Sequence, residues 1–394
     1  MTNQEAHAIA FDNTEIAYKH KDLPALKRAY LLFKLLSYRG LVTVGTPMLN
    51  VAMTLKLPVE GLIRRTIFGH FCGGESIEAC DRVIAQLGEL HVGTILDYSV
   101  ESGDSEADFD HTCSEIIRTI EYAANNRSIP FAVVKVTGLG NFEVLEKVSA
   151  SQTLTDRESE AFAKLESRFY RICEAAYQRD IPLLVDAEHS WIQQTIDTLT
   201  MEAMRRYNRA RAIIYNTYQL YRHDKLKALK ADEEQARTGG FNLGAKIVRG
   251  AYMEKERHRA MSMGYQSPIH INKEAVDNDF NAAARFCLEN IDHIGLVVGS
   301  HNEDSCLKVV SQMEALGISN DHPSVYFSQL LGMCDHISLN LAHANYNVAK
   351  YMPYGPVRHV MPYLLRRAQE NSSVSGQSGR ERSLLKREID RRKK

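Results

Sequence analysis

Short apolar runs alternate with long amphipathic segments over most of the chain. Eight runs rich in β-branched residues are typical of buried strands, and they span Val92–Glu101, Phe131–Gly140, Pro182–Ser190, Arg211–Gln219, Gly244–Tyr252, Gly295–Asn302, Ser324–Gly332 and Tyr346–Gly355. The segments between them, such as 113–125, 158–177 and 278–290, carry apolar residues at helical spacing. Eight strands joined by helices favour a (βα)8 barrel over an open doubly wound sheet.

The first 90 residues have a different pattern, in which apolar residues recur at helical spacing. Two such sets are Leu26, Tyr30, Phe33 and Leu36, and Ile77, Cys80, Ile84 and Leu87. We therefore expect an α/β protein with three parts: an N-terminal helical region (1–90), a barrel (91–374) and a flexible basic tail (375–394).

The expectation for the tail rests on its charge. A polar stretch, NSSVSGQSG, is followed by RERSLLKREIDRRKK, which holds eight basic and three acidic residues. Charge blocks of this kind are usually solvated or disordered. The alternative is contact with anionic lipid at a membrane surface.

Composition narrows the function classes. The 394 residues include 48 Lys and Arg against 49 Asp and Glu, so a chain-wide nucleic-acid function is not expected. No apolar run is long enough for a transmembrane helix. Glu5, Asp12 and Glu15 precede the first arginine, a pattern unlike secretory and transit peptides, and we expect a cytoplasmic protein with peripheral contact with the inner membrane as the alternative. The seven cysteines are scattered and form no CxxC pair, which predicts buried reduced thiols and no metal site.

Polar groups end most of the strand-like runs. They are Asp97, Lys135, Asp186, Asn216, Arg249, His301, Asn302 and Gln329. Active sites of (βα)8 barrels are built at the carboxyl ends of the strands, so these residues are candidates. A charge within an apolar run costs several kcal/mol unless it is paired, so Lys135 and Asp186 either pair with each other or face a polar centre. A lysine at a strand end also fits a Schiff-base lyase.

The last amphipathic segment, PVRHVMPYLLRRAQENSS, has a second candidate face. Tyr363, Arg366, Arg367 and Glu370 follow the spacing i, i+3, i+4, i+7 and share one side of a helix. Two guanidinium groups match the two oxygens of a substrate carboxylate. The alternative is a solvated face in which Arg366 and Glu370 form an ordinary helical ion pair.

Six segments resemble the proline dehydrogenase family, in the same order as the family's motifs. They are LLVDAEHSWIQ (183–193), IIYNTYQLY (213–221), KIVRGAYMEKER (246–257), SHN (300–302), SQLLGMCDHIS (328–338) and KYMPYGPVRHVMPYLLRRAQEN (350–371). The resemblance implies a distorted (βα)8 barrel that binds FAD noncovalently, with the last helix over the barrel mouth. It also implies oxidation of L-proline to Δ1-pyrroline-5-carboxylate and transfer of the electrons to a quinone.

The same resemblance implies a role for each residue. Arg366, Arg367 and Lys135 would bind the proline carboxylate, Glu370 and Asp186 would hold these cations, and Tyr363, Tyr351 and Leu330 would pack against the ring. Tyr252 would lie beside the flavin. The flavin contacts would be Asn216, Lys246, Val248, Gly250 and Ala251, where Lys246 replaces the arginine of some members. Lys273, Ser300, His301 and Asn302 would surround the pyrophosphate and adenosine, although His301 also fits a capping or core histidine.

The resemblance is poor over residues 1–90, and we expect no aldehyde-dehydrogenase part and no DNA-binding segment. Two other enzymes remain as alternatives: a 4-hydroxyproline dehydrogenase, and a lyase that uses Lys135. A barrel that binds a ligand without redox chemistry is the alternative from another class. A yellow protein whose flavin bands are bleached by proline would separate these possibilities.

Overall fold

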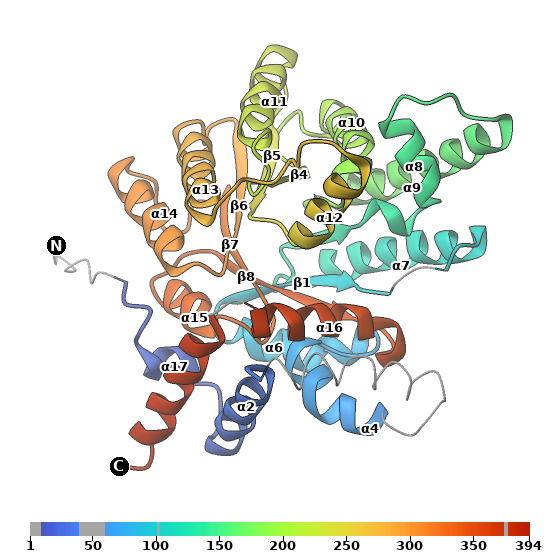
Figure 1. Cartoon of the computed structure of the whole chain (residues 1–394). Helices are drawn as coiled ribbons and strands as arrows, with labels where there is room; N and C mark the ends of the chain where they lie inside the picture. Colours follow the sequence, from blue (N-terminus) through green and yellow to red (C-terminus); the bar gives the residue numbers. More distant parts are fainter. Residues whose placement is uncertain (1–8, 39–59, 101–102, 374–376) are drawn as a thin grey trace.

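The computed structural model describes residues 9–38, 60–100, 103–373 and 377–394, and it contains a closed barrel of eight parallel strands (Figure 1). The strands are β1 (Val92–Tyr98), β2 (Phe131–Val134), β3 (Leu183–Val185), β4 (Ile214–Gln219), β5 (Leu243–Val248), β6 (Ile294–Gly299), β7 (Val325–Leu330) and β8 (Val348–Tyr354). All eight predicted strands are confirmed, but their bounds differ: β2 ends at Val134 and β3 at Val185, six and five residues earlier than expected, and β5 and β6 each start one residue earlier.

Helices surround the barrel and flank it in sequence. Those before β1 are α1 (Thr14–Tyr18), α2 (Leu23–Leu36), α4 (Glu60–Ile63), α5 (Gly69–Phe71) and α6 (Asp81–Gly88), with the π-helix η1 (Arg64–Phe68) and the 3-10 turn η2 (Glu78–Cys80). Those between strands are α7 (Glu106–Ala124), η3 (Val136–Gly138), α8 (Phe142–Ser149), α9 (Asp156–Gln178), α10 (Ser190–Tyr207), α11 (Lys225–Gly239), α12 (Met253–Met263), α13 (Lys273–Glu289), α14 (Glu303–Ala315) and α15 (Asp335–His343). Two helices follow β8, namely α16 (Val357–Ser373) and α17 (Gln377–Arg391).

Local sequence explains where several helices begin. Ser105 and Thr155 form capping boxes at the starts of α7 and α9, and the side chain of Asn302 accepts from Ser305 N–H at the start of α14. These caps satisfy backbone donors that have no partner within the helix. They therefore fix the residues at which α7, α9 and α14 begin.

The barrel interior is filled by side chains. Pairing of β1 with β8 closes the sheet, with Ile95 opposite Tyr351. The interior cluster consists of Ile95, Phe131, Val133, Leu184, Ala212, Tyr215, Val297, Ala349 and Tyr351. A Cβ at Gly295 would lie 2.2 Å from the Tyr215 hydroxyl, so this glycine makes room for the tyrosine. The interior is a packed core, and polar chemistry is confined to the carboxyl ends of the strands.

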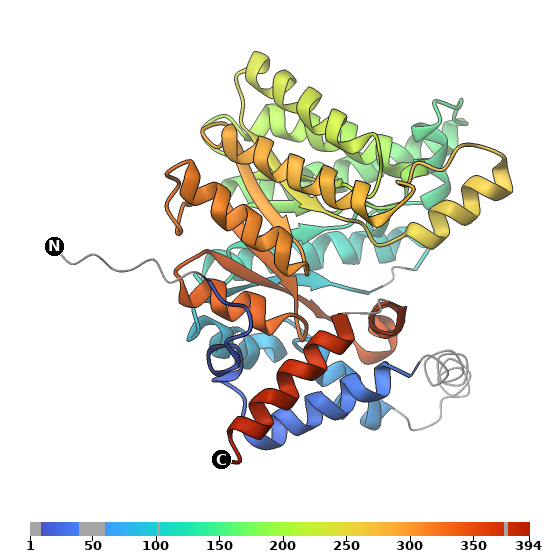
Figure 2. The same ribbon diagram turned by 60° about the vertical axis from the view of Figure 1, so that its left-hand side comes forward.

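The predicted flexible tail is wrong for the described residues 377–394, because they form α17. This helix lies against α2 and α1 in both views (Figures 1 and 2). Leu384, Leu385 and Ile389 pack with Leu26 and Phe33 in one buried cluster. The amphipathic spacing of α17 is weak in the sequence because its buried face includes two glutamates as well as the leucines. Most of its basic residues lie on the exposed face. None of the helices in the described ranges is long and apolar enough to cross a membrane.

Candidate active site

A row of alternating charges crosses the carboxyl ends of the strands. Lys135, directly after β2, lies between Asp97 of β1 at 2.6 Å and Asp186, directly after β3, at 3.4 Å. Asp186 also contacts Lys246 of β5 at 2.6 Å. Asp97 was noted as a polar strand end but given no role, because a partner on the neighbouring strand is not visible in one sequence. The pairing expected for Lys135 and Asp186 is present.

The neighbouring charges control protonation in this row. Burial opposes the charged form of Lys135, but Asp97 and Asp186 outweigh it and raise the pKa of the amine. Burial also opposes ionisation of Asp186, but Lys246 and Lys135 outweigh it and lower the pKa of the carboxyl group. Lys135 and Asp186 are therefore both charged over the physiological pH range. A third of the Lys135 side chain remains exposed and available to a ligand.

Tyr351 of β8 joins the row from the other side. Its hydroxyl donates to Asp186 at 2.6 Å and accepts from Lys246 at 3.3 Å. The ammonium of Lys246 also lies 4.4 Å from the centre of the Tyr351 ring. Burial, followed by the charge of Asp186, raises the pKa of this phenol, so it remains protonated. Leu330, the last residue of β7, packs against the interior cluster that contains Tyr351.

Helix α16 brings its predicted face to the same region. Tyr363 and Arg367 are buried, and the guanidinium carbon of Arg367 lies 5.2 Å from the Tyr363 ring centre. The charge of Arg366 acts on Tyr252, and that of Arg367 acts on His301. Both of these partners follow the carboxyl end of a strand, which agrees with a helix over the barrel mouth. The side chain of Glu370 lies outside the described residues.

Aromatic rings line the approach to Arg366. Tyr252 lies 4.3 Å from His189, ring centre to ring centre, and His189 stacks on Trp191 at 4.4 Å. Burial raises the pKa of Tyr252 to about 12, with the charge of Glu188 as the next cause. Burial lowers the pKa of His189 to about 4, and Lys255 and Arg366 add to this effect. His189 and Trp191 were not predicted as site residues, because an aromatic ring in sequence gives no sign of its neighbours.

A second polar cluster lies at the ends of β5 and β6. Arg249 donates to Ser300 at 2.9 Å and to Asp277 at 2.7 Å. The predicted Lys273 shares Asp277 and is largely exposed. Ser300 and Lys273 are thus brought together by Arg249, which the sequence analysis had noted only as a strand end. This cluster presents cations and a hydroxyl, the groups that bind phosphate oxygens.

His301 and Asn302 have structural contacts of their own. Nε2 of His301 accepts from Leu330 N–H at 3.1 Å, so the ring is neutral with its proton on Nδ1. Burial lowers the pKa of this ring to about 3, and the charges of Lys350 and Arg367 add to the effect. Asn302 caps α14. His301 therefore joins the end of β6 to Leu330 of β7.

One predicted residue faces away from this region. The Asn216 amide donates to Asp197 of α10 at 3.0 Å, so Asn216 points from β4 into the layer between sheet and helices. The interior face of β4 carries Tyr215 instead. Gln219, four residues after Tyr215, shares its side of the strand, because alternate side chains point the same way. The oxygen Oε1 of Gln219 is buried and has no hydrogen-bond partner among the described residues.

The predicted residues at the end of β5 form an open backbone surface. Val248 ends the strand, and Gly250 and Ala251 are exposed beyond it. Gly250 has φ of +125°, and a Cβ there would lie 2.4 Å from the Tyr221 ring. Glycine is therefore required by the fold at this position. It also leaves the backbone accessible from the mouth.

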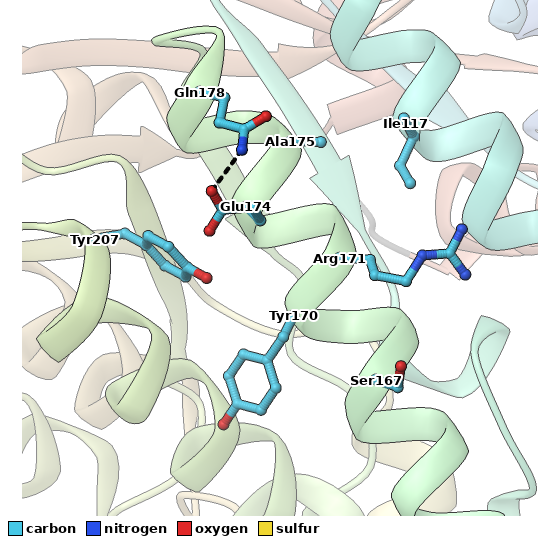
Figure 3. A pocket seen from close by; sticks show the side chains of 8 residues that line it. All are labelled: Ile117, Ser167, Tyr170, Arg171, Glu174, Ala175, Gln178 and Tyr207. Carbon is cyan, nitrogen blue, oxygen red and sulfur yellow. Dashed lines mark hydrogen bonds between the residues drawn. The ribbon is translucent and has the colours of Figure 1, made fainter.

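Two surface grooves lie among the helices around the barrel. One, of about 510 Å³, is lined by Ile117, Ser167, Tyr170, Arg171, Glu174, Ala175, Gln178 and Tyr207 of α7, α9 and α10 (Figure 3). It contains none of the strand-end residues. The other, of about 550 Å³, lies along α12 and includes Trp191, which stacks on His189. The second groove thus borders the aromatic approach, whereas the first lies in the helical layer.

Comparison with known proteins places this arrangement in a family. The family model described as proline dehydrogenase matches residues 80–380. "Proline dehydrogenase 1, mitochondrial" of Dictyostelium discoideum is 33% identical over 437 residues, covering 99% of this chain and 76% of that protein. "Hydroxyproline dehydrogenase" of Xenopus laevis is 32% identical over 426 residues, covering 99% and 91%.

A solved structure has the same fold. Proline utilization A (PutA) from Bdellovibrio bacteriovorus, inactivated by N-propargylglycine, superposes with a TM-score of 0.73 at 19% identity. The match covers 97% of this chain and 41% of that one, so this chain spans about two fifths of its length. The family match and the relatives over most of the chain lead to one conclusion: this chain belongs to the proline dehydrogenase family.

Proposed function

We propose that this protein oxidises L-proline to Δ1-pyrroline-5-carboxylate, with FAD as its cofactor and a quinone as electron acceptor. The observation that carries the proposal is that cations from two separate elements, Arg366 of α16 and Lys135 of the charged row, both act on Tyr252 after the end of β5. Arg367 follows Arg366 on the same helix, beside Tyr363. Cations near aromatic rings are appropriate for a small amino acid with a carboxylate.

The chain's own residues would orient the substrate. Lys135 remains protonated because of Asp97 and Asp186, and its exposed third can meet a carboxylate together with the two arginines. Tyr351 and Leu330 offer a flat and an aliphatic surface for a five-membered ring. Since Tyr351 is fixed by Asp186 and Lys246, the ring would meet a rigid wall. Such positioning lowers the barrier by limiting the conformations of the bound substrate.

The donor set fits FAD. When bound, FAD would supply the redox chemistry by accepting a hydride, two electrons with one proton, from the substrate carbon. Gln219 offers a buried amide oxygen with no hydrogen-bond partner in the described part of the chain, appropriate for a ring N–H, and the exposed backbone at Gly250 permits close approach. Lys246 would place a positive charge near the ring, where reduction creates negative charge. Arg249, Ser300 and Lys273 would hold the pyrophosphate.

A quinone acceptor brings the protein to a lipid surface. Quinones with long tails dissolve in membranes, so the reduced cofactor must be approached from there. Lys386 and Arg387, on the exposed face of α17, would supply basic groups for anionic lipid. In this proposal the basic residues lie on the ordered helix α17, and they contact lipid as in the alternative raised from the sequence.

The alternatives are less well supported. A Schiff-base lyase needs a lysine with a lowered pKa, whereas the pKa of Lys135 is raised. A 4-hydroxyproline dehydrogenase needs space and a polar partner beside the ring. The Tyr351 hydroxyl already has two partners, which favours proline over its hydroxylated form.

An absorption spectrum of the purified protein tests the proposal. We expect flavin bands that bleach when L-proline is added without air and return with a soluble ubiquinone analogue. D-proline serves as the control and should leave the spectrum unchanged. Colourless protein that cannot be reconstituted with FAD would contradict the cofactor assignment, and a flavin that proline does not bleach would contradict the substrate.

A further inference from the structure

Three helices from the two ends of the chain form one unit beside the barrel. We call α1, α2 and α17 the terminal brace (Figure 2). These helices share the buried cluster of Ala17, Tyr18, Leu26, Ala29, Phe33, Leu384, Leu385 and Ile389. Most of this unit lies beyond residues 80–380, which match the family model. Its contacts with the barrel are therefore features of this chain that the family match does not explain.

The brace meets the loop that follows β7. This loop, residues 331–334, contains two left-handed backbone conformations, at Gly332 with φ of +77° and at Cys334 with φ of +53°. A left-handed non-glycine residue is unfavourable and persists only where surrounding contacts hold it. A Cβ at Gly332 would lie 2.3 Å from the carbonyl oxygen of His70, so the loop is also closely packed against α5.

Three side chains hold the loop, those of Glu381, His70 and Lys350. Glu381 of α17 accepts from Cys334 N–H with Oε1, and its Oε2 lies 3.5 Å from the Tyr18 hydroxyl of α1. His70 donates to Gly332 O at 2.9 Å, and Lys350 donates to Met333 O. The Glu381 side chain is only 6% exposed, so its contacts compete little with water.

The next residue continues this network. Asp335 forms ion pairs with Lys21, which follows α1, and with Lys350 of β8 at 2.9 Å. Lys350 immediately precedes Tyr351, and its side chain is 1% exposed. The brace is therefore connected to the loop by both a hydrogen bond to Cys334 and ion pairs around Asp335.

The loop is joined directly to the candidate proline pocket. Leu331 N–H donates to the carbonyl oxygen of Tyr351 at 2.8 Å. Leu330 N–H donates to Nε2 of His301 at 3.1 Å, and the Leu330 side chain packs beside Tyr351. A change in the loop would therefore move the pocket wall formed by Leu330.

We propose that Glu381 is a positioning residue: it fixes the left-handed Cys334 and thereby holds Leu330 against the substrate ring. The proposal rests on the function proposed above for its kinetic consequence, but not for the contact itself. Because Leu330 contacts the ring in both the bound substrate and the transition state, its displacement weakens binding more than turnover. The terminal brace is thus part of the support for proline binding.

Three variants at one position and one control test the proposal. Glu381→Ala removes the contacts with Cys334 N–H and the Tyr18 hydroxyl, together with that of His336 Nδ1 at 3.8 Å. Glu381→Asp retracts the carboxyl group by one methylene, and Glu381→Gln keeps an oxygen for Cys334 N–H and an NH2 for the Tyr18 hydroxyl. The control, Ile389→Ala, removes apolar contacts from the same cluster about 12 Å further along α17, where no contact with the loop exists.

The kinetic readout is the split between KM and kcat for proline in the FAD-loaded enzyme. We expect Glu381→Ala to raise KM about tenfold with kcat within about twofold of wild type. Glu381→Gln should restore KM to within about twofold, and Ile389→Ala should lower Tm without changing KM. A Glu381→Ala enzyme with wild-type KM, or an Ile389→Ala enzyme with an equal rise, would overturn the positioning role.

A second readout does not need activity. Hydrogen exchange of the peptide covering residues 330–336 should accelerate about tenfold or more in Glu381→Ala, and remain at the wild-type rate in Glu381→Gln and Ile389→Ala. If Glu381→Ala is not recovered as a folded protein, Glu381→Asp replaces it in both experiments. We expect Glu381→Asp also to raise KM for proline and to accelerate exchange of the loop peptide. If the wild-type enzyme does not oxidise proline, the proposed function fails, and hydrogen exchange alone tests the contact between the brace and the loop. Exchange that stays at the wild-type rate in Glu381→Ala would then overturn this contact.

Discussion

The Tyr351 hydroxyl donates to the carboxylate of Asp186 across the barrel mouth, at a distance of 2.6 Å. The two residues belong to β8 and to the end of β3, which are not neighbours in the barrel. The bond therefore spans the opening and links the charged row of Asp97, Lys135, Asp186 and Lys246 to Tyr351 on β8. Four predictions follow from this arrangement and from the residues around it.

Substrate preference should depend on Tyr351. Because its ring fills space and its hydroxyl already has partners, a substrate 4-hydroxyl would be buried without one, at a cost of about 1–3 kcal/mol. We expect wild type to prefer L-proline over trans-4-hydroxyproline by roughly 10- to 100-fold in kcat/KM. Tyr351→Ser should weaken proline oxidation and narrow this ratio, as steady-state kinetics on both substrates will measure.

Tyr354→Phe is the matched control for this substitution. Tyr354 lies on the same strand, but its hydroxyl lies 2.9 Å from Thr119 of α7, outside the barrel. Its loss should leave the substrate ratio unchanged. A serine variant that keeps the full preference for proline would show that Tyr351 does not select the substrate.

Loss of either arginine of α16 should reduce catalysis while FAD remains bound. Arg366→Met or Arg367→Met removes a charged partner of the substrate carboxylate, which lowers kcat/KM by roughly 30- to 1,000-fold. Flavin absorbance per protein should stay at the wild-type value. Arg358→Met, on the first turn of the same helix and paired with Glu60, is the control that should retain activity. Wild-type kinetics in both Arg366→Met and Arg367→Met would show that neither arginine binds the substrate.

Asp186 should contribute stability that depends on pH. Its pKa is lower in the folded state than in the unfolded chain, so its stabilisation is present above the unfolded value and lost as pH falls through the folded one. At pH 7, Asp186→Asn leaves Lys246 without its carboxylate and should cost about 3 kcal/mol in urea unfolding. The difference from wild type should shrink below about pH 4. Asp390→Asn is the control, because Asp390 is an exposed residue on α17, and it should change stability by less than about 0.5 kcal/mol. A destabilisation by Asp186→Asn that does not depend on pH would contradict the lowered pKa of Asp186.

Gly250→Ala should destabilise the protein through two separable causes. The left-handed φ alone costs about 1 kcal/mol, and the contact with the Tyr221 ring adds to it. Gly240→Ala is the control for the first cause, because Gly240 also has positive φ but no atom within 4 Å of an added Cβ. Calorimetry should give a clearly larger fall in Tm for Gly250→Ala. Equal falls would mean that Tyr221 moves aside without cost.

The strands were predictable because each is a short apolar run, and the ends of the strands indicated where polar chemistry would gather. The assignment of Asn216 shows the limit of that reasoning. Asn216 and Gln219 lie three residues apart on one strand and so face opposite sides, and both faces of β4 are buried. Without a residue known to face the interior, the sequence does not show which amide faces the barrel.

The C-terminal helix was missed for a different physical reason. Its buried face contains Glu381 and Glu388 beside the leucines, so hydrophobicity alone gives a weak pattern. Each glutamate is held by a partner that is distant or basic, such as Cys334 N–H for the first and Arg392 for the second. Likewise, the partnership of Lys135 with Asp97 depends on the pairing of β1 with β2, which a single sequence does not reveal.

The packing of α17 on α2 also has a consequence for synthesis. The apolar side chains of α2, Leu26 and Phe33, are translated about 350 residues before their partners Leu384 and Leu385. At ~5–20 residues per second, that interval lasts roughly 20–70 s. Throughout it the nascent chain carries an uncovered apolar helix, a surface that chaperones bind. The barrel can close before α17 emerges, but α2 reaches its final partners only after α17 has been made.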